Sequence, residues 1–385
     1  RDPEMSRGLG DVYKRQYLKT FRSFSMNNTK KIGVLTSGGD CSGLNAVIRA
    51  VVNAASQKGW EVYGILNGTD GLTETPIQYE VLTEHNYSDS AWPRLSGSYL
   101  GSLNKGVKME SLEEMSAKFG RGVKELGLDA IVVIGGDGSM NICGNYCKGA
   151  GIKMVGIPKT IDNDTPITEF SVGFNSAVQV CMDAVDSLNL TARSHHRALI
   201  LEVMGRDAGH LAMHAALAGM ADVCLVPEIP YKIDSIINKL KAVKASGRNH
   251  AVIVVSEGIK NENGEHLIGA QNLIGEKVYG GIGDYLSAEI NKRYKEFQTR
   301  VTRLGHVQRA GAPTAFDRTL AAVFGAKAVE LLDKGETNRM VIWKGGKVSS
   351  AAIEEVIKEG TTLLNPDSDY VKAAVATGMY VGEVK

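Results

Sequence analysis

Short apolar runs alternate with longer amphipathic stretches along most of the chain. Runs such as AIVVI at 130–134 lack polar alternation, which is typical of strands buried on both faces of a parallel sheet. The stretches between them carry apolar residues at helical spacing. Strands are predicted at about 31–36, 60–66, 130–134, 154–157, 198–204, 223–226, 251–255 and 299–304, and helices at about 44–56, 111–126, 208–217, 233–243, 285–294 and 315–333. This order predicts an α/β fold with two doubly wound, mainly parallel sheets.

Charged side chains follow several of the predicted strands directly. The strand ends carry Asp137, Asp162, Arg206, Glu257 and His306. In doubly wound sheets, ligands bind at the carboxyl ends of the strands. We therefore expect these side chains to contribute to ligand sites rather than to scattered surface positions.

Two glycine-rich turns join a predicted strand to a predicted helix. The first, at 37–43, contains Gly38, Gly39 and Asp40, and the second, at 135–139, contains Gly136, Asp137, Gly138 and Ser139. Such turns present backbone N–H groups and a helix N-terminus to a phosphate. The first turn matches neither the Walker nor the GxGxxG pattern, and a tight glycine turn can also serve packing alone. Asp137 beside a polyphosphate would be a Mg²⁺ partner, directly or through water.

The stretch IPKTIDND at 157–164 places two carboxylates and a lysine within eight residues. Asp162 and Asp164 are two residues apart, so on a turning segment they can face one site. Such pairs commonly hold Mg²⁺ or accept a proton from a hydroxyl. We expect Pro158 to end the preceding strand and to fix the turn. A solvated acidic turn is the alternative interpretation of the DND tripeptide by itself.

Composition limits the class of protein. The chain has 385 residues, 43% of them hydrophobic and 23% charged, which is ordinary for a globular protein and long enough for two domains. The net charge of +1 gives no basic footprint for nucleic acid or an acidic membrane. The five cysteines are scattered and form no CxxC pair, so reduced thiols in a cytoplasmic protein are expected. Cys143 and Cys147, one helical turn apart, are more typical of helix packing than of a metal site.

Residues 1–25 show no apolar periodicity and precede Met26. We expect them to be a non-native or disordered tail outside the fold. A mitochondrial transit peptide is the competing interpretation, which the acids Asp2, Glu4 and Asp11 weaken because such peptides are poor in acidic residues.

Taken together, the motifs resemble those of the phosphofructokinase family. They are TSGGDCSGLNAVIR (36–49), VVIGGDGS (132–139), GIPKTIDND (156–164), SHHR (194–197), EVMGRDAG (202–209), SEG (256–258) and LGHVQRAGAPTAFDR (304–318). GGDG alone also occurs in NAD and diacylglycerol kinases, whereas the whole set is highly specific. The resemblance implies two domains: 31–173 plus about 308–358 for nucleotide, and about 174–307 plus about 359–385 for fructose 6-phosphate.

The resemblance also implies phosphoryl transfer to the 1-hydroxyl of fructose 6-phosphate, with Mg²⁺ at Asp137. Catalytic roles fall on Asp162 as the base, Thr160 and Arg206 near the phosphoryl group in flight, and Lys159. Sugar and 6-phosphate contacts fall on Asp164, Met204, Gly205, Glu257, His306 and Arg309. Arg197 and Arg300 correspond to arginines that reach the 6-phosphate from a neighbouring subunit, which implies a homo-oligomer, either a dimer or a tetramer.

The phosphoryl donor depends mainly on residue 138. Pyrophosphate-using relatives have an Asp there, which would fill and repel the space that the α-phosphate of ATP needs. Gly138 leaves that space open, so we expect ATP, although Lys159 also occurs in pyrophosphate users. The pyrophosphate-dependent enzyme is the runner-up. A catalytically inactive sugar-phosphate-binding subunit is a distant alternative, which the presence of Asp162 argues against.

Some positions depart from the short bacterial enzymes. Asn104 with Lys105, and Thr69, replace residues near the nucleotide, and Asn53 and Asn189 replace basic residues of the effector site. We therefore expect a weak or absent response to ADP and phosphoenolpyruvate. Glu228 lies near the effector site in the family, and a structural role is the other interpretation.

Overall fold

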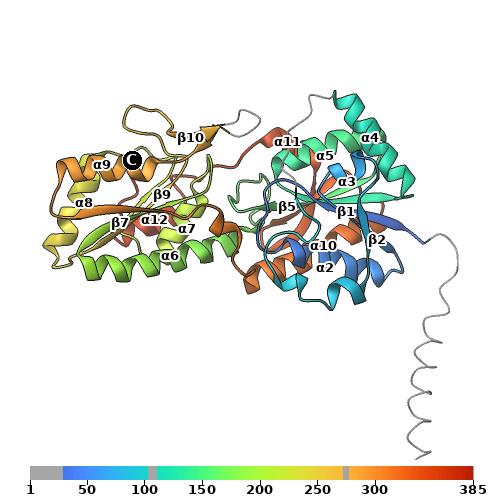
Figure 1. Ribbon diagram of the computed structural model, residues 1–385, viewed down its shortest axis with the longest axis horizontal. Coiled ribbons are helices and arrows are strands. Elements are labelled where there is room, and N and C mark those ends of the chain that lie inside the picture. Colours follow the sequence, from blue (N-terminus) through green and yellow to red (C-terminus); the bar gives the residue numbers. More distant parts are fainter. Residues whose placement is uncertain (1–28, 103–110, 272–276, 385) are drawn as a thin grey trace, which may run out of the picture.

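The computed structural model describes residues 29–102, 111–271 and 277–384. The predicted tail at 1–25 lies outside this range, as do Asn104 and Lys105. The chain forms two lobes side by side along its longest axis, each built around its own sheet (Figure 1).

The first sheet has the strand order β14-β13-β5-β4-β1-β2-β3, with β6 pairing to β5. Its parallel strands are β1 (Lys31–Thr36), β2 (Glu61–Ile65), β4 (Ala130–Gly135), β5 (Met154–Thr160), β6 (Val172–Gly173) and β13 (Arg339–Lys344), and its antiparallel edges are β3 (Tyr79–Leu82) and β14 (Lys347–Ala352). Helices α2 (Leu44–Ser56) and α10 (Ala315–Asp333) pack together on one face, and α4 (Leu112–Glu125) and α5 (Asp137–Ala150) on the other, which also carries α3 (Asp70–Thr73) and α11 (Ile353–Glu359).

Strand β4 shows why the apolar run 130–134 needs no polar alternation. Val132 and Ile134 pack into the core beneath α2 and α10, whereas Ile131 and Val133 pack into the core beneath α4 and α5. Successive side chains of a strand point to opposite faces, so burial of both faces requires an apolar residue at every position.

The second sheet has the order β12-β7-β9-β8, all parallel. Its strands are β7 (Arg197–Val203), β8 (Val223–Leu225), β9 (Ala251–Ser256) and β12 (Gln298–Arg303). Helices α6 (Phe174–His195) and α7 (His210–Ala218) cover one face, and α8 (Ile233–Ala245) and α9 (Ile282–Arg293) the other. A hairpin of β10 (Ile268–Gln271) and β11 (Lys277–Tyr279) projects beyond this sheet (Figure 1).

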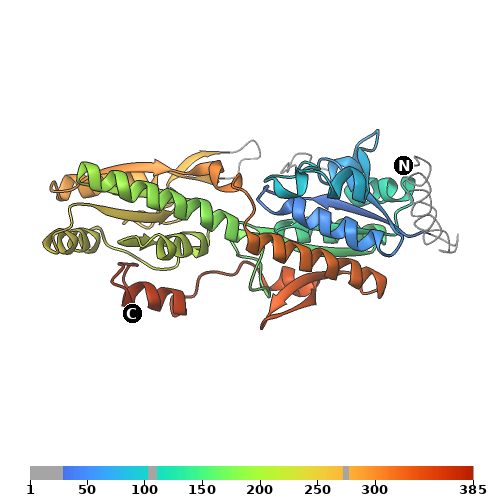
Figure 2. The same ribbon diagram turned by 90° about the horizontal axis from the view of Figure 1, so that it is seen from below.

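The chain passes between the lobes at several points (Figure 2). It enters the second lobe through α6 and returns through η3 (Gly305–Arg309) into α10. After α11 it crosses again to α12 (Asp369–Ala376), which packs against α7. Tyr380 then bridges to Val223 beside β8, so the end of the described chain belongs to the second lobe.

The α/β class with mainly parallel sheets is confirmed, and several elements were not predicted. These include α3, β6, α6, the hairpins β10–β11 and β13–β14, α11, α12 and the short elements β3, η1 (Glu84–Ser88) and η2 (Trp92–Arg94) within 76–106. Cys143 and Cys147 are buried beneath α5, as helix packing requires, and the five cysteines are free thiols. Among the described helices, none is long and apolar enough to cross a membrane.

The prediction that Pro158 ends its strand is wrong, because β5 continues to Thr160. The Met154 carbonyl accepts the Asn338 N–H, so the backbone polar groups of Met154 point toward β13. Successive residues of a strand direct these groups alternately to the two neighbouring strands, so those of Gly156 and Pro158 also point toward β13. Since β13 pairs with β5 no further than Gly156, the missing N–H of Pro158 interrupts no bond to β13.

Asp317 joins the start of α6 to α10. Its fully buried carboxylate accepts hydrogen bonds from the N–H of Gly173 (3.1 Å) and from the N–H and hydroxyl of Ser176 (2.8 and 2.6 Å). Because D317A leaves these buried donors without an acceptor, we expect it to lower the free energy of unfolding by about 3 kcal/mol in urea titrations. Asp333 ends the same helix α10 and forms an exposed ion pair with Lys58. D333A removes this pair and should change the free energy of unfolding by less than about 1 kcal/mol. Equal effects of the two variants would contradict this role for Asp317.

Candidate active site

The carboxyl ends of the two sheets face one another across the lobes and bring charged groups together around Asp162. This residue follows β5 of the first sheet, whereas Arg206 follows β7 of the second. Burial raises the pKa of the Asp162 carboxyl, and the nearby cations of Arg309, Lys159 and Arg206 oppose that shift. The site is therefore a carboxylate held among three cations drawn from both lobes.

The first glycine turn is fixed through its carbonyl groups. Lys159 is almost fully buried, and its Nζ donates to the Gly39 carbonyl at 2.6 Å. The Arg309 guanidinium donates to the Asp40 carbonyl at 2.8 Å. A Cβ at Gly39 would lie only 2.8 Å from a nitrogen of this guanidinium. Gly38 takes the left-handed φ of 83° that the turn requires.

The second glycine turn begins helix α5, with Gly136 as the N-cap and no side-chain cap. A Cβ at Gly135 would clash with Ser139 at 2.4 Å, so this turn is tight. At Gly138, in contrast, a Cβ would meet nothing within 4 Å. The N-terminus of α5 therefore has open space at residue 138, although the Gly138 N–H donates to the Asp137 carboxylate at 2.6 Å. The helix dipole there favours an anion.

Backbone contacts fix the acidic turn after β5. The Asp162 N–H donates to the Thr160 hydroxyl at 3.0 Å. Asn163 adopts a φ of 51°, and its side chain bonds to the backbone of Ser171 (2.9 Å) and Glu169 (3.1 Å). Burial, reinforced by the charges of Asp162 and Asp137, raises the pKa of Asp164 to about 6. These three carboxyl groups therefore lie close enough to repel one another.

The turn after β7 supplies Met204, Gly205 and Arg206. Gly205 has a φ of 140° and Arg206 a φ of 49°, both in the left-handed region. The Arg206 N–H donates to Glu257 at 3.3 Å, and a Cβ at Gly258 would meet the Arg206 carbonyl at 1.7 Å. Burial raises the pKa of Glu257 to about 7. The SEG motif thus shapes the arginine turn by close backbone contact.

Gln308, which the sequence reasoning did not single out, links η3 to this turn. Its buried Oε1 accepts the Met204 N–H at 3.0 Å and the Cys181 thiol at 3.2 Å, and its Nε2 donates to the Gly305 carbonyl at 2.8 Å. Its place between His306 and Arg309 in one motif was the available signal. His306 itself is exposed on η3.

The family described as "Phosphofructokinase" matches residues 31–332. The chain belongs to this family. It is 45% identical over 366 residues to "ATP-dependent 6-phosphofructokinase 1" of Nostoc sp. strain PCC 7120, covering 93% of this chain and 100% of the relative.

Solved phosphofructokinases share the fold. The enzyme of Saccharomyces cerevisiae has a TM-score of 0.72 at 27% identity over 91% of this chain, which spans 47% of the yeast chain. A pyrophosphate-dependent phosphofructokinase of Nitrosospira multiformis has a TM-score of 0.75 at 22% identity, covering 92% of this chain and 93% of that one. The latter likeness concerns the fold alone.

Two residues that the resemblance assigns to the phosphofructokinase site lie away from it in the chain. Arg197 begins β7, six residues before Val203, and a strand rises about 3.3 Å per residue, which places Arg197 about 20 Å from the turn at Arg206. Arg300 pairs with Leu199 near the same end of the sheet. The fold therefore separates these two arginines from the cations around Asp162.

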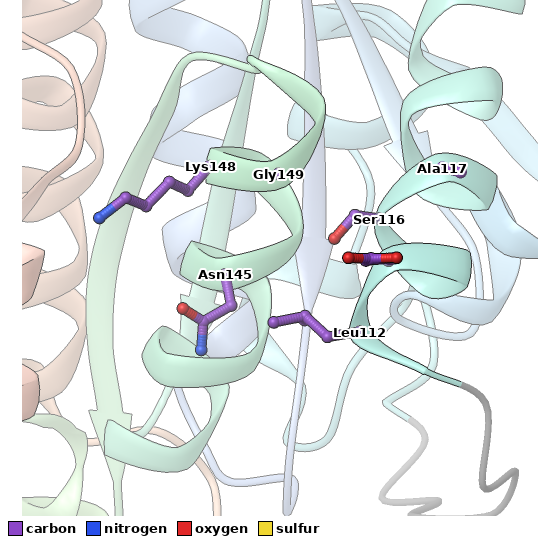
Figure 3. A pocket seen from close by; sticks show the side chains of 7 residues that line it. Leu112, Ser116, Ala117, Asn145, Lys148 and Gly149 are labelled. Atoms are coloured by element: carbon purple, nitrogen blue, oxygen red, sulfur yellow. The ribbon is translucent and has the colours of Figure 1, made fainter.

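Two surface pockets lie away from this group of charges. One, lined by Leu112, Glu113, Ser116, Ala117, Asn145, Lys148 and Gly149, lies between α4 and α5 (Figure 3). It contains no glycine turn, and its Lys148 is paired with Glu354 at 2.7 Å. A second pocket adjoins α6 at Asn189 and His250. We assign the active site to the strand ends because the polar groups converge there.

The raised pKa of Glu257 makes stability depend on pH. In the folded state the Glu257 carboxyl has a pKa of about 7, against the ordinary value of 4.5 that applies in the unfolded chain. Between these values the unfolded chain has lost the proton and the folded chain retains it, so the stability of the fold falls as pH rises. E257Q removes the titration while keeping an oxygen that accepts the Arg206 N–H. We expect the melting temperature of the native chain, relative to E257Q, to fall from pH 5 to pH 8 in thermal scans. E359Q, at an exposed position on α11, serves as the control. A constant or rising difference for E257Q would contradict the burial of this carboxyl.

Proposed function

We propose that the chain is an ATP-dependent 6-phosphofructokinase, a glycolytic kinase of the cytoplasm. It would transfer the γ-phosphoryl group of ATP to the 1-hydroxyl of fructose 6-phosphate, giving fructose 1,6-bisphosphate and ADP. The observation that carries this proposal is the grouping of Asp162 with Lys159, Arg206 and Arg309 beside two glycine turns. Phosphoryl transfer needs such groups because its catalysis is mostly positioning and charge stabilisation.

Each lobe would bind one substrate. Residues 31–173 plus about 308–358 include both glycine turns and would bind the nucleotide at Gly38, Gly39, Asp40 and the turn from Gly136 to Ser139. Residues 174–307 plus about 359–385 include the arginine turn and would bind the sugar phosphate. The acidic turn after β5 lies at the junction between them.

Asp162 would act as the general base. Its carboxylate accepts the proton of the sugar 1-hydroxyl as that oxygen forms a bond to the γ-phosphorus, and the bond from the γ-phosphorus to the bridging oxygen breaks to release ADP. The burial that raises the pKa of Asp162 makes it a stronger base than an exposed aspartate. The Thr160 hydroxyl, already oriented toward the Asp162 N–H at 3.0 Å, would orient the transferring group.

Cations would balance the charge of the phosphoryl group. Arg206 has an exposed side chain on a backbone that Glu257 and Gly258 hold in place, and its guanidinium forms an exposed ion pair with Asp207 at 3.8 Å. Because this pair is exposed and loose, the guanidinium can turn to meet the transferring oxygens. The Lys159 ammonium group is hydrogen-bonded to the Gly39 carbonyl of the first glycine turn. It would hold that turn in place, and its charge would stabilise the phosphoryl group. The N–H groups at the start of α5 would cradle the nucleotide phosphates.

Magnesium fits the donor set at Asp137. Among the residues that the structure describes, no three His, Cys, Asp or Glu side chains form a metal-binding group. Mg²⁺ in kinases, however, is bound by one or two carboxylates together with phosphates and waters. The mutual repulsion of Asp137, Asp162 and Asp164 is what a cation relieves. When bound, Mg²⁺ would neutralise phosphate charge, with Asp137 as its protein partner.

The sugar phosphate would be bound by groups from two subunits. Met204, Gly205, Glu257 and Asp164 would contact the sugar, and His306 and Arg309 the 6-phosphate. Along the strands, Arg197 lies about 20 Å and Arg300, paired with Leu199, about 13 Å from the turn that follows Val203, which favours their use by a neighbouring subunit. We propose a homo-oligomer on this ground.

The open space at Gly138 and the ATP-dependent relative from Nostoc support ATP as the donor. Lys159, which also suits pyrophosphate, is explained by its bond to Gly39 and so favours neither donor. The pyrophosphate-dependent enzyme remains the runner-up. An inactive regulatory subunit has no use for a carboxylate base surrounded by cations.

The direct test is a donor assay on protein beginning at Met26. We expect turnover of fructose 6-phosphate with MgATP, and a loss of about 10²–10⁴-fold in kcat for D162N, because the amide cannot accept the hydroxyl proton. Coupled detection of fructose 1,6-bisphosphate measures both. Turnover with pyrophosphate only, or unchanged kcat in D162N, would contradict the proposal.

The donor also depends on the side chain at position 138. G138D should lower kcat/KM for ATP roughly a hundredfold, because a carboxylate beside the phosphates introduces like-charge repulsion of several kcal/mol. G138A should retain most of the activity, since a Cβ there meets nothing within 4 Å. Steady-state kinetics with varied ATP distinguish the two variants. Equal losses in both would show that bulk, not charge, matters at this position.

A further inference from the structure

The segment 360–364, which we call the strap, crosses from α11 to the second lobe (Figure 2). It contacts the acidic turn after β5 and the start of α7, which follows the Arg206 turn. The Thr362 N–H donates to the Asp164 carbonyl at 2.8 Å, on the acidic turn of the first lobe. The Thr362 carbonyl lies 3.2 Å from His210 Nε2, at the start of α7 in the second lobe. The strap therefore links the backbone of the acidic turn to the His210 side chain at the start of α7.

Glu228 completes this link. Its Oε1 accepts the Leu364 N–H and the Gly209 N–H, both at 2.8 Å. Gly209 is the N-cap of α7 and lies three residues after Arg206. A Cβ at Gly209 would come within 2.6 Å of Glu228 Oε2, so the carboxylate and this backbone are in close contact.

The remaining features of Glu228 agree with a buried acceptor rather than a free charge. Among described residues, its Oε2 is buried without a hydrogen-bond partner. Burial raises the pKa of the carboxyl, opposed by the hydrogen bonds from Gly209 and Leu364. The two bonds that matter use one oxygen, and an amide oxygen can accept both of them equally well.

We propose that Glu228 is a positioning residue that, through the strap, holds the Arg206 turn in register with the Asp162–Asp164 turn. The two turns belong to different sheets, and catalysis requires them to meet at one phosphoryl group. A displacement of about 1 Å between catalytic groups can lower the rate about a hundredfold. This inference rests on the proposed kinase activity. It assigns to Glu228 a role inside the chain, in place of the effector contact that the resemblance suggests.

Two conservative variants of Glu228 distinguish the effect of side-chain length from the effect of side-chain charge. E228Q keeps the length of the side chain and one acceptor oxygen but removes the charge, whereas E228D keeps the charge but withdraws the oxygens by one methylene. We expect E228Q to retain kcat within about twofold, and E228D to lose about tenfold or more in kcat with a smaller change in the KM for ATP. E296A, at a surface glutamate paired with Lys244 in the same lobe, is the control and should match the native chain. Melting temperatures of all four proteins, with assays run well below them, exclude simple unfolding.

Hydrogen exchange tests the link independently of turnover. By mass spectrometry, peptides covering 205–212 and 360–366 should exchange faster in E228D than in the native chain, and E228Q should match the native chain. Loss of kcat in E228Q equal to that in E228D would show that charge is required and would overturn the proposal, as would native kcat and exchange in E228D. A native chain inactive with every donor would refute the proposed function instead, while the exchange comparison would still decide whether Glu228 holds the strap.

Discussion

The grouping of three cations around the partly buried carboxylate of Asp162 is the constraint on which this structure depends. A carboxylate withdrawn from water is costly unless opposite charges or hydrogen bonds compensate for it. Around Asp162 the compensation comes from Lys159 on its own strand, and from Arg206 and Arg309. Arg309 lies on the segment that returns from the second lobe, and it also binds the carbonyl of Asp40 in the first glycine turn. The same cation thus offsets a charge and joins two parts of the fold.

Backbone crowding determines the rest of the site. Several glycines near it occupy positions where a Cβ would overlap an atom of a neighbouring turn, as Gly258 would overlap the carbonyl of Arg206. Arg206 itself has a positive φ, which is uncommon for a residue with a long side chain and is held only where the surroundings enforce it. The turn that carries the exposed guanidinium is therefore shaped by contacts to its backbone, and the side chain makes only an exposed ion pair with Asp207.

The sequence predicted those elements whose local pattern agrees with their tertiary environment. The bounds of α2 and α10 agree with the predicted 44–56 and 315–333, because each has a regular apolar stripe and α10 begins after the N-cap Thr314. Helix α6 was missed because it begins after Gly173 in a left-handed conformation without a side-chain cap, and its surface is rich in polar residues. The end of β5 was predicted wrongly at Pro158 because proline is excluded from a strand only where its N–H would be needed for pairing. Which residues pair with one another is not visible in a sequence.

For the candidate site, the sequence allowed residues to be selected by the chemistry of their side chains, but it gave no signal for contacts in which the backbone is the partner. Asp162 and Arg206 stand out as charged groups at strand ends, whereas the strap acts through the N–H and carbonyl of Thr362, which any residue possesses. Gln308 and Glu228 are similar: their importance lies in which backbone groups they accept from, and these come from distant parts of the chain.

The geometry of the second sheet also bears on the proposed homo-oligomer. The carboxyl end of β7 leads to Arg206, while its amino end begins with Arg197, and parallel strands place all like ends on the same edge. Arg300 on the neighbouring strand β12 pairs with Leu199, two residues after Arg197 and four before the end of β7. A sheet of this kind can serve two sites at once, its own at one edge and that of a second subunit at the other. If the 6-phosphate needs cations beyond Arg309, symmetry between subunits supplies them without any further element in the fold.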